Sequence, residues 1–117
     1  MSFGTSDAVS FVLHTAINGL AERQNVISDD IANVDTPGFR ARSVDFETAL
    51  KAAIDRGESN GDITASVTPT DTPVGANGNN VDLRKEEMAA IQTQYQYQIV
   101  GQAFSNRADI MRTVAAM

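Results

Sequence analysis

One stretch of the chain, ISDDIANVDTPGFRAR at Ile27–Arg42, carries a helical pattern directly into a turn. Apolar residues lead into it at steps of three, four and seven: Val9, Leu13, Leu20, Ile27, Ile31 and Val34. This spacing predicts one helix from Asp7 to Val34, about 42 Å long at about 1.5 Å per residue. Ser6 or Asp7 can cap its start, and Pro37 ends it because the residue before a proline disfavours helical backbone angles.

A second, shorter helix is predicted after the turn. Asp45 is its candidate N-cap. Apolar residues then recur at helical spacing before Gly57, at Phe46, Ala49, Leu50, Ala53 and Ile54. From Gly57 to Asn80 the chain is rich in Gly, Asn, Ser, Thr and Pro. This composition predicts an irregular segment with at most a short strand at Ile63–Val67, disordered when it has no partner.

The residues from Asp82 to the end contain no proline and predict one long final helix. Its apolar positions are Met88, Ile91, Tyr95, Ile99, Ile110 and Val114. Met88, Ile99 and Ile110 are eleven apart, a spacing that favours a straight or slightly right-handed packing path. We expect Tyr95 in this packed stripe and Tyr97 on the exposed face.

The sequence therefore predicts an all-α protein whose two long terminal helices pack antiparallel in the manner of a coiled coil. Residues 1–56 form the first helix, the turn and the short helix, residues 57–80 the irregular linker, and residues 81–117 the last helix. All three belong to one structural unit, with both chain ends at one end of a rod. Gly19 and Gly101 fall at similar heights, which leaves two readings open: close approach of the helix backbones, or tolerance of glycine on exposed faces.

Composition and charge argue against several classes of function. The net charge is -6 and no basic run follows one face, so nucleic-acid binding is not expected. The chain has no cysteine, which excludes disulfides, thiolate catalysis and zinc–cysteine sites. No secretory signal pattern is visible. The uncharged run Ala8–Ala21 is too short and too polar to insert in a membrane.

No residue pattern predicts catalysis, a cofactor or a metal ion. His14 has no Cys, second His or carboxylate at metal-ligand spacing, and we interpret it as a helix-packing or half-exposed residue. Asp29, Asp30 and Asp35 cluster near the end of the first helix. Because no cleft or substrate-positioning shell accompanies them, we interpret them as a solvated face.

The turn has a physical logic of its own. Pro37 and Gly38 suit the two central positions of a type II turn, and Phe39 can fold back as an apolar plug. The turn also matches the pattern Ala-Asn-x-x-Thr-Pro-Gly-aromatic, at Ala32, Asn33, Thr36, Pro37, Gly38 and Phe39. This pattern resembles the N-terminal signature of the bacterial flagellar axial family, the rod and hook proteins.

A second match lies before the last helix. It consists of Asn79, Asn80, Val81, Asp82 and Leu83, and a smaller match occurs at Ser43–Phe46. Together with the short middle segment, these residues are similar to the short proximal rod proteins more than to the longer rod and hook members. One departure from the family pattern is that Leu83 and Met88 are five positions apart, one more than is usual.

The resemblance implies a structural subunit of the basal-body rod, the drive shaft that crosses the periplasm and transmits torque for motility. It implies export by the flagellar type III apparatus without a cleaved signal peptide, and terminal helices that become ordered on assembly. The partners it implies are further copies of the chain, other rod proteins, and ring and adaptor components of the basal body. It implies no cofactor and no membrane insertion.

Two alternatives stay open. Within the family, the chain could be another short rod subunit. Outside it, a small acidic helical chaperone or regulatory module would form a stable dimer in isolation, whereas a rod subunit would be partly disordered alone. An enzyme is not predicted, because its activity would have to come from His14 or the three aspartates without a cleft.

Overall fold

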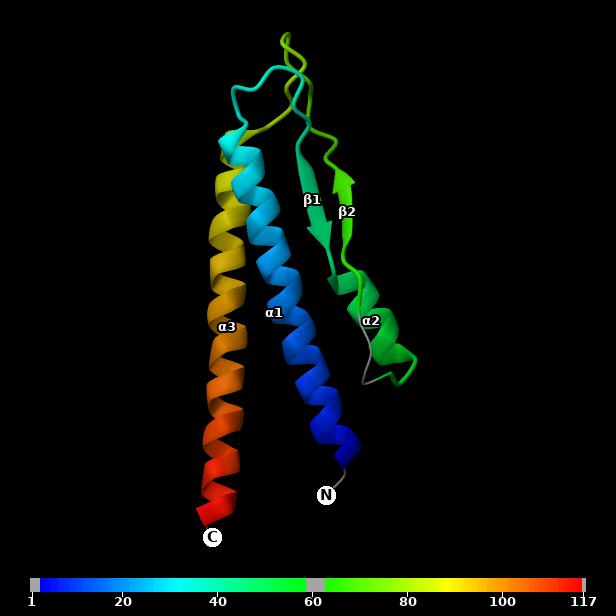
Figure 1. The fold of residues 1–117 in the computed structure, drawn as a ribbon, viewed down its shortest axis with the longest axis vertical. Helices are drawn as coiled ribbons and strands as arrows, with labels where there is room; N and C mark the ends of the chain where they lie inside the picture. The colour runs from blue at the N-terminus through cyan, green and yellow to red at the C-terminus, as the bar shows by residue number, and fades with distance from the viewer. Residues whose placement is uncertain (1–2, 59–62, 117) are drawn as a thin grey trace.

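The structure, a computed structural model, describes residues 3–58 and 63–116. Its elements are α1 (Phe3–Ala32), β1 (Arg42–Asp45), α2 (Glu47–Asp55), β2 (Ser66–Pro69) and α3 (Leu83–Ala116). They form a flat rod of 65 × 28 × 14 Å. The turn after α1 and the loop before α3 lie together at one end of this rod, which we call the tip end (Figure 1).

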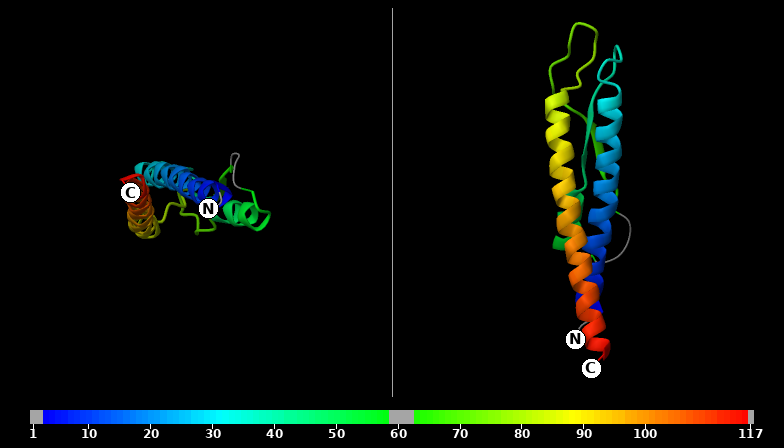
Figure 2. Two further views of the ribbon diagram at one scale, coloured as in Figure 1. Left: turned by 90° about the horizontal axis from the view of Figure 1, so that it is seen from below. Right: turned by 90° about the vertical axis from the view of Figure 1, so that its left-hand side faces the viewer.

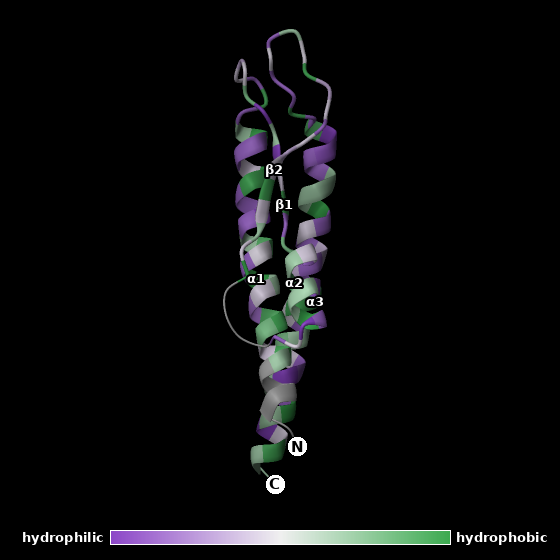
Figure 3. Cartoon of the chain, turned by 90° about the vertical axis from the view of Figure 1, so that its right-hand side faces the viewer, coloured by the Kyte–Doolittle hydropathy of each residue, from purple (hydrophilic) through white to green (hydrophobic). Residues whose placement is uncertain are grey.

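α1 occupies the middle of the rod (Figures 1 and 2). α3 runs antiparallel along one side of it, and the two strands and α2 lie along the other. Seen from the sheet side, β1 and β2 cover the tip-end halves of the long helices, and α2 continues below them (Figure 3). The start of α1 and the end of α3 lie opposite the tip end. The predicted antiparallel pair of terminal helices is confirmed.

The boundaries of the first helix differ from those predicted. α1 begins at Phe3, so Ser6 and Asp7 lie inside the helix and not at its cap. It ends at Ala32, shortly before the predicted end at Val34. The spacing of apolar residues locates the helix well, but it carries little information about the terminal turn.

The all-α prediction is wrong in one respect, because β1 and β2 form a small antiparallel sheet. Val44 of β1 lies opposite Val67 of β2. β1 is absent from the sequence prediction, and the strand expected at Ile63–Val67 is shifted toward Pro69. Both strands are short, and Val44 is their only buried residue, so they lack the apolar alternation by which strands are recognised.

The predicted second helix is confirmed as α2. The buried residues of its predicted apolar face are Phe46, Leu50 and Ala53. Ile54, expected on the same face, is exposed. Asp45 stands one residue before the N-cap position, which Phe46 occupies, yet its Oδ1 accepts a hydrogen bond from the Thr48 amide at 3.1 Å, as a capping side chain does.

The core lies between α1 and the segment formed by β1 and α2. Its central members are Phe11, Leu20, Phe46, Leu50 and Ala53. Tyr97 and Val100 of α3 pack against the same cluster. Because its members come from α1, α2 and α3, this cluster joins all three helices. Burial of each large apolar side chain in it contributes about 1.5–3 kcal/mol to stability.

Gly19 is approached closely, but by a side chain and not by the other long helix. A Cβ atom at Gly19 would overlap the ring of Phe46. A Cβ atom at Gly101 would meet no other atom within 4 Å. The reading of close backbone approach is therefore wrong for both glycines, because Gly19 contacts the side chain of Phe46, whereas tolerance on an exposed face holds for Gly101.

We expect Gly19→Ala to lower the free energy of unfolding by about 1–3 kcal/mol, because the added methyl group overfills the contact with Phe46. Gly101→Ala is the matched control and should raise it by about 1 kcal/mol, because alanine is the better helix former on an open face. Urea unfolding followed by circular dichroism measures both changes. A Gly19→Ala protein as stable as Gly101→Ala would contradict the contact.

Candidate assembly site

The turn after α1 has the hydrogen bond and backbone of a type II turn, as predicted. The Phe39 amide donates to the Thr36 carbonyl oxygen at 3.2 Å, with Pro37 and Gly38 between them. Gly38 has a φ of 76°, a left-handed angle that residues with a side chain disfavour. The Thr-Pro-Gly-aromatic pattern is therefore the sequence that this backbone shape requires.

Asn33 connects this turn to the end of α1. Its Nδ2 donates to the Asp29 carbonyl oxygen at 2.8 Å, and its Oδ1 accepts from the Thr36 hydroxyl at 3.0 Å. The first bond gives a donor to the Asp29 carbonyl oxygen, which lies in the last turn of the helix. Phe39 is half-buried, whereas Ala32 is exposed like Pro37 and Gly38.

Asn79, from the second motif, binds the first motif directly. Its Nδ2 donates to the carbonyl oxygens of Asn33 and Thr36, each at 2.8 Å. Its Oδ1 accepts from the Val81 amide at 2.8 Å. The side chain is 8% exposed, so it replaces the water that those backbone groups would otherwise bind.

Asn80 extends the same junction toward the sheet. Its side-chain Oδ1 accepts from the Ala41 backbone amide at 2.6 Å, and its backbone amide donates to the Phe39 carbonyl oxygen at 3.2 Å. Its carbonyl oxygen accepts from the Thr72 hydroxyl at 2.7 Å. We call the contacts between residues 33–39 and 77–80 the tip junction. The two motifs, far apart in sequence, are thus one structural unit.

Two glycines bring the loops of the tip junction together. A Cβ atom on Gly78 would lie 3.2 Å from the Cα atom of Gly38, and the Gly38 amide donates to the Asn77 carbonyl oxygen at 2.9 Å. The remaining residues of the second motif lead into α3. Asp82 Oδ1 accepts from the Lys85 amide at 3.2 Å, which caps the helix, and Leu83 is exposed.

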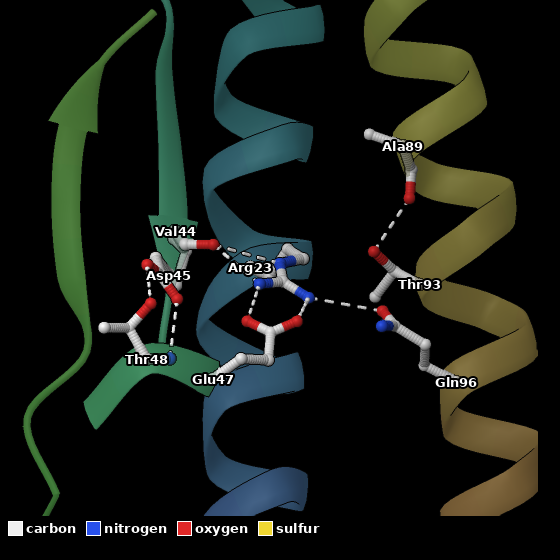
Figure 4. A network of polar contacts seen from close by, with 8 residues as sticks. All are labelled: Arg23, Val44, Asp45, Glu47, Thr48, Ala89, Thr93 and Gln96. Atoms are coloured by element: carbon white, nitrogen blue, oxygen red, sulfur yellow. Dashed lines mark hydrogen bonds and ion pairs between the residues drawn. The ribbon is translucent and has the colours of Figure 1, made fainter. Parts of the chain in front are cut away.

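Arg23, which no sequence pattern marks, joins α1 to its neighbours on both sides (Figure 4). Its guanidinium donates to the Val44 carbonyl oxygen at 2.7 Å, to the Glu47 carboxylate at 3.0 Å and to Gln96 Oε1 at 3.2 Å. It also lies 4.9 Å from the centre of the Phe46 ring. Burial raises the pKa of Glu47, but the hydrogen bond and the charge of Arg23, together with hydrogen bonds to the backbone, hold this pKa below its ordinary value.

Asp30 is not part of a solvated face, and that prediction is wrong. Its side chain is fully buried and accepts a hydrogen bond from the Arg42 amide at 3.2 Å. Glu86 of α3 lies beside it and is also buried. Burial raises the pKa of both carboxyl groups, in the case of Glu86 to about 8. Asp29 and Asp35 are exposed, as predicted.

The predicted apolar stripe of α1 packs mainly against other parts of the same chain. Leu13, Leu20 and Ile27 are buried, Ile31 and Val34 are half-buried, and Val9 is exposed. His14 lies next to this stripe and makes an edge-on ring contact with Phe104 of α3, with ring centres 5.5 Å apart. This contact agrees with the helix-packing interpretation of His14.

The predicted stripe of α3 faces away from the rest of the chain. Met88, Ile91, Tyr95, Ile99, Ile110 and Val114 each expose 60–68% of their surface. The prediction that this stripe packs within the chain is therefore wrong. The predicted positions of the two tyrosines are also wrong, because Tyr95 is exposed and Tyr97 packs against the core. The reason is that Arg23 and Asp30 of α1 select the more polar side of α3, which carries Thr93 and Glu86.

Within residues 3–58 and 63–116, no group of three or more His, Cys, Asp or Glu side chains is placed to hold a metal ion. No helix in this part of the chain is both long enough and apolar enough to cross a membrane. The features that stand out are therefore the tip junction, the polar contacts of Arg23 and Asp30, and the outward stripe of α3.

We expect Asn79→Ala to lower the free energy of unfolding by about 1–3 kcal/mol, because it removes two hydrogen bonds to the carbonyl oxygens of Asn33 and Thr36 and leaves the Val81 amide without its acceptor. Asp35→Ala is the control, since Asp35 is exposed in the same turn and its side chain makes no hydrogen bond within the described residues. Urea unfolding and limited proteolysis at the tip end measure the effect. Equal stability of the two variants would show that Asn79 does not hold the tip junction.

Known proteins are similar to most of the chain. Residues 12–40 match the family model described as flagella basal body rod protein. The flagellar basal body rod protein FlgB of Bacillus subtilis is 32% identical over 114 residues, which cover 87% of this chain and 88% of the relative. FlgB of Escherichia coli is 32% identical over 128 residues, covering 92% and 93%. FlgB of Borreliella burgdorferi is 32% identical over 109 residues, covering 74% and 80%.

The family match covers α1 from Val12 onward and the turn that follows it, which is one of the two segments of the tip junction. The longer alignments extend the similarity through the sheet and into α3. Identity at this level over most of both chains establishes common descent and a common fold. The chain therefore belongs to the FlgB family of flagellar basal body rod proteins.

Proposed function

We propose that this chain is a structural subunit of the bacterial flagellar basal-body rod, in its proximal part, and that it assembles through the outward face of α3. The observation that carries this proposal is the exposed apolar stripe of α3 on a chain whose family builds the rod. Such a subunit acts by packing and transmitting torque, and no residue of it has a catalytic role.

The outward face of α3 has the properties of an assembly surface. Its apolar side chains would each contribute about 1.5–3 kcal/mol if a neighbour buried them. Residues 88–106 carry no charge, so burial there has no charge-desolvation cost. A shallow hollow of about 470 Å³ lies on this face, lined by Ala90, Ile91, Gln94, Tyr95 and Gln98. Tyr95 offers the aromatic anchor that such contacts commonly use.

The end of α3 supports the same proposal. From Ser105 to Ala116 every described side chain apart from Arg107 is exposed, and Ile110, Met111 and Val114 are among them. Val9, near the start of α1, is exposed too. Exposed apolar side chains therefore also occur near the start of α1 and the end of α3, away from the tip junction.

We propose that the subunit assembles with further copies of itself, with other rod proteins, and with ring and adaptor components of the basal body. Its site would be the rod in the periplasmic space, reached through the flagellar type III export apparatus without a cleaved signal peptide. Membership of the FlgB family supports these statements. A FlgC-type subunit is less well supported, because the long alignments above are to FlgB proteins, and a chaperone is not favoured for the same reason.

We expect Tyr95→Glu and Ile99→Glu to abolish motility and rod assembly when each variant replaces the native chain. Thermal unfolding of the isolated variants should stay close to that of the parent, because both side chains are more than half exposed. Ser105→Glu is the matched control, since it adds the same charge to an exposed position of α3 away from the stripe. Motile cells that carry both stripe variants together would refute assembly through this face.

A photoreactive residue at position 95 identifies the neighbour. We expect its crosslinks in assembled basal bodies to join this chain to a rod subunit, and the sequence of the crosslinked peptide distinguishes a FlgB-type neighbour from a FlgC-type one. The same residue at position 105 serves as the control and should crosslink much less.

A further inference from the structure

Two buried carboxyl groups meet between α1 and α3 near the tip end. Asp30 is 0% exposed and Glu86 is 7% exposed. Glu86 lies within hydrogen-bonding reach of Asp30. Two ionised carboxylates can only accept hydrogen bonds, so they cannot bond to each other unless one of them carries a proton. A hydrogen bond between these two side chains therefore requires that one of the two carboxyl groups is protonated.

The groups on the α1 and β1 side do not neutralise the pair by direct contact. The Arg42 amide donates to Asp30 at 3.2 Å, but the Arg42 guanidinium binds Asp29 at 2.9 Å instead. Asp29 itself repels the charge of Asp30, while the Arg42 guanidinium attracts it through space.

The groups on the α3 side act on Glu86 at a distance. Lys85 attracts its charge and Asp82 repels it. A groove of about 260 Å³ runs beside Glu86, and its other charged residues are Arg23, Arg42, Glu47 and Lys85. Among the described residues, no Lys or Arg forms an ion pair with Asp30 or Glu86.

We propose that Asp30 and Glu86 share one proton and form a pH-sensitive clamp between α1 and α3, which is strongest in acidic solution, weakens as the pH rises through neutrality and is lost in alkaline solution. The proposal concerns the isolated chain, so it does not rest on the proposed function. Its success or failure leaves the assembly experiments above unaffected.

The direction of the pH effect follows from burial. Burial raises the pKa of Glu86 from its ordinary value of 4.5 to about 8, and it raises the pKa of Asp30 as well. Between these two values for Glu86 the folded chain binds a proton that the unfolded chain has released. The stabilisation is therefore complete below the lower value, declines as pH rises through the interval, and is lost above the upper value.

Other carboxyl groups act in the opposite direction. Hydrogen bonds from Thr48 hold the pKa of Asp45 below its ordinary value, and the bond from Arg56 does the same for Glu58. Their contributions are lost as pH falls, which masks the clamp in the stability curve of the parent alone. The test must therefore compare two chains that share these groups.

Glu86→Gln supplies this comparison, because the glutamine amide is a permanent donor in place of the shared proton. Glu87→Gln is the matched control, with the same change of charge at the exposed neighbouring residue. We expect the unfolding constant of the parent, divided by that of Glu86→Gln, to rise by up to about tenfold per pH unit between about pH 5.5 and 7.5 and to level off above about pH 8.5. The unfolding constant of the parent, divided by that of Glu87→Gln, should change by less than about twofold over the same pH range.

Carbon NMR of the side-chain carboxyl groups in the full parent chain provides a second measurement that needs no variant. We expect the Glu86 resonance to titrate near pH 8. A Glu86 resonance that titrates near 4.5, or a Glu86→Gln ratio as flat as that of the control, overturns the proposal. If Glu86→Gln fails to fold, the titration of the parent decides alone.

Discussion

The whole arrangement depends on how α1 satisfies the unpaired edge of β1. Residues two apart in a strand direct their backbone groups to the same edge. On the edge that faces α1, the Arg42 amide donates to Asp30 and the Val44 carbonyl oxygen accepts from Arg23. Asp30 and Arg23 are seven apart, two turns of helix, so one face of α1 takes the place of a third strand. The same two side chains also contact α3, so that β1 and α3 are both fixed to α1.

Much of this fold follows from the sequence, because helices and tight turns have strong local signals. The period of apolar residues locates α1, α2 and α3, and Pro37-Gly38 determines the turn. β1 escapes prediction because its backbone bonds to side chains of α1 and not only to another strand. Asp30 escapes for a related reason: a charged residue in a helix is usually solvated, and only tertiary contacts reveal that this one is buried.

The stripe of α3 illustrates a different limit. Hydrophobic periodicity identifies a face that avoids water, but it does not say whether that face meets the same chain or another one. On α1 the stripe is internal, with Leu20 only 1% exposed, whereas on α3 Ile99 is 68% exposed. The asparagines of the tip junction are marked by resemblance alone. Their hydrogen bonds across more than forty positions of sequence become visible only in three dimensions.

The unsupported end of α3 has a consequence for the kinetics of growth. Isolated helices shorter than about 12–15 residues are marginal in water, and residues 105–116 have little packing of their own. In the assembly proposed above, a free chain must order this segment unaided, whereas a chain that joins a preformed end would find a surface that orders it. Nucleation in solution would therefore be disfavoured relative to elongation. A subunit built in this way would stay dispersed until it met a growing end.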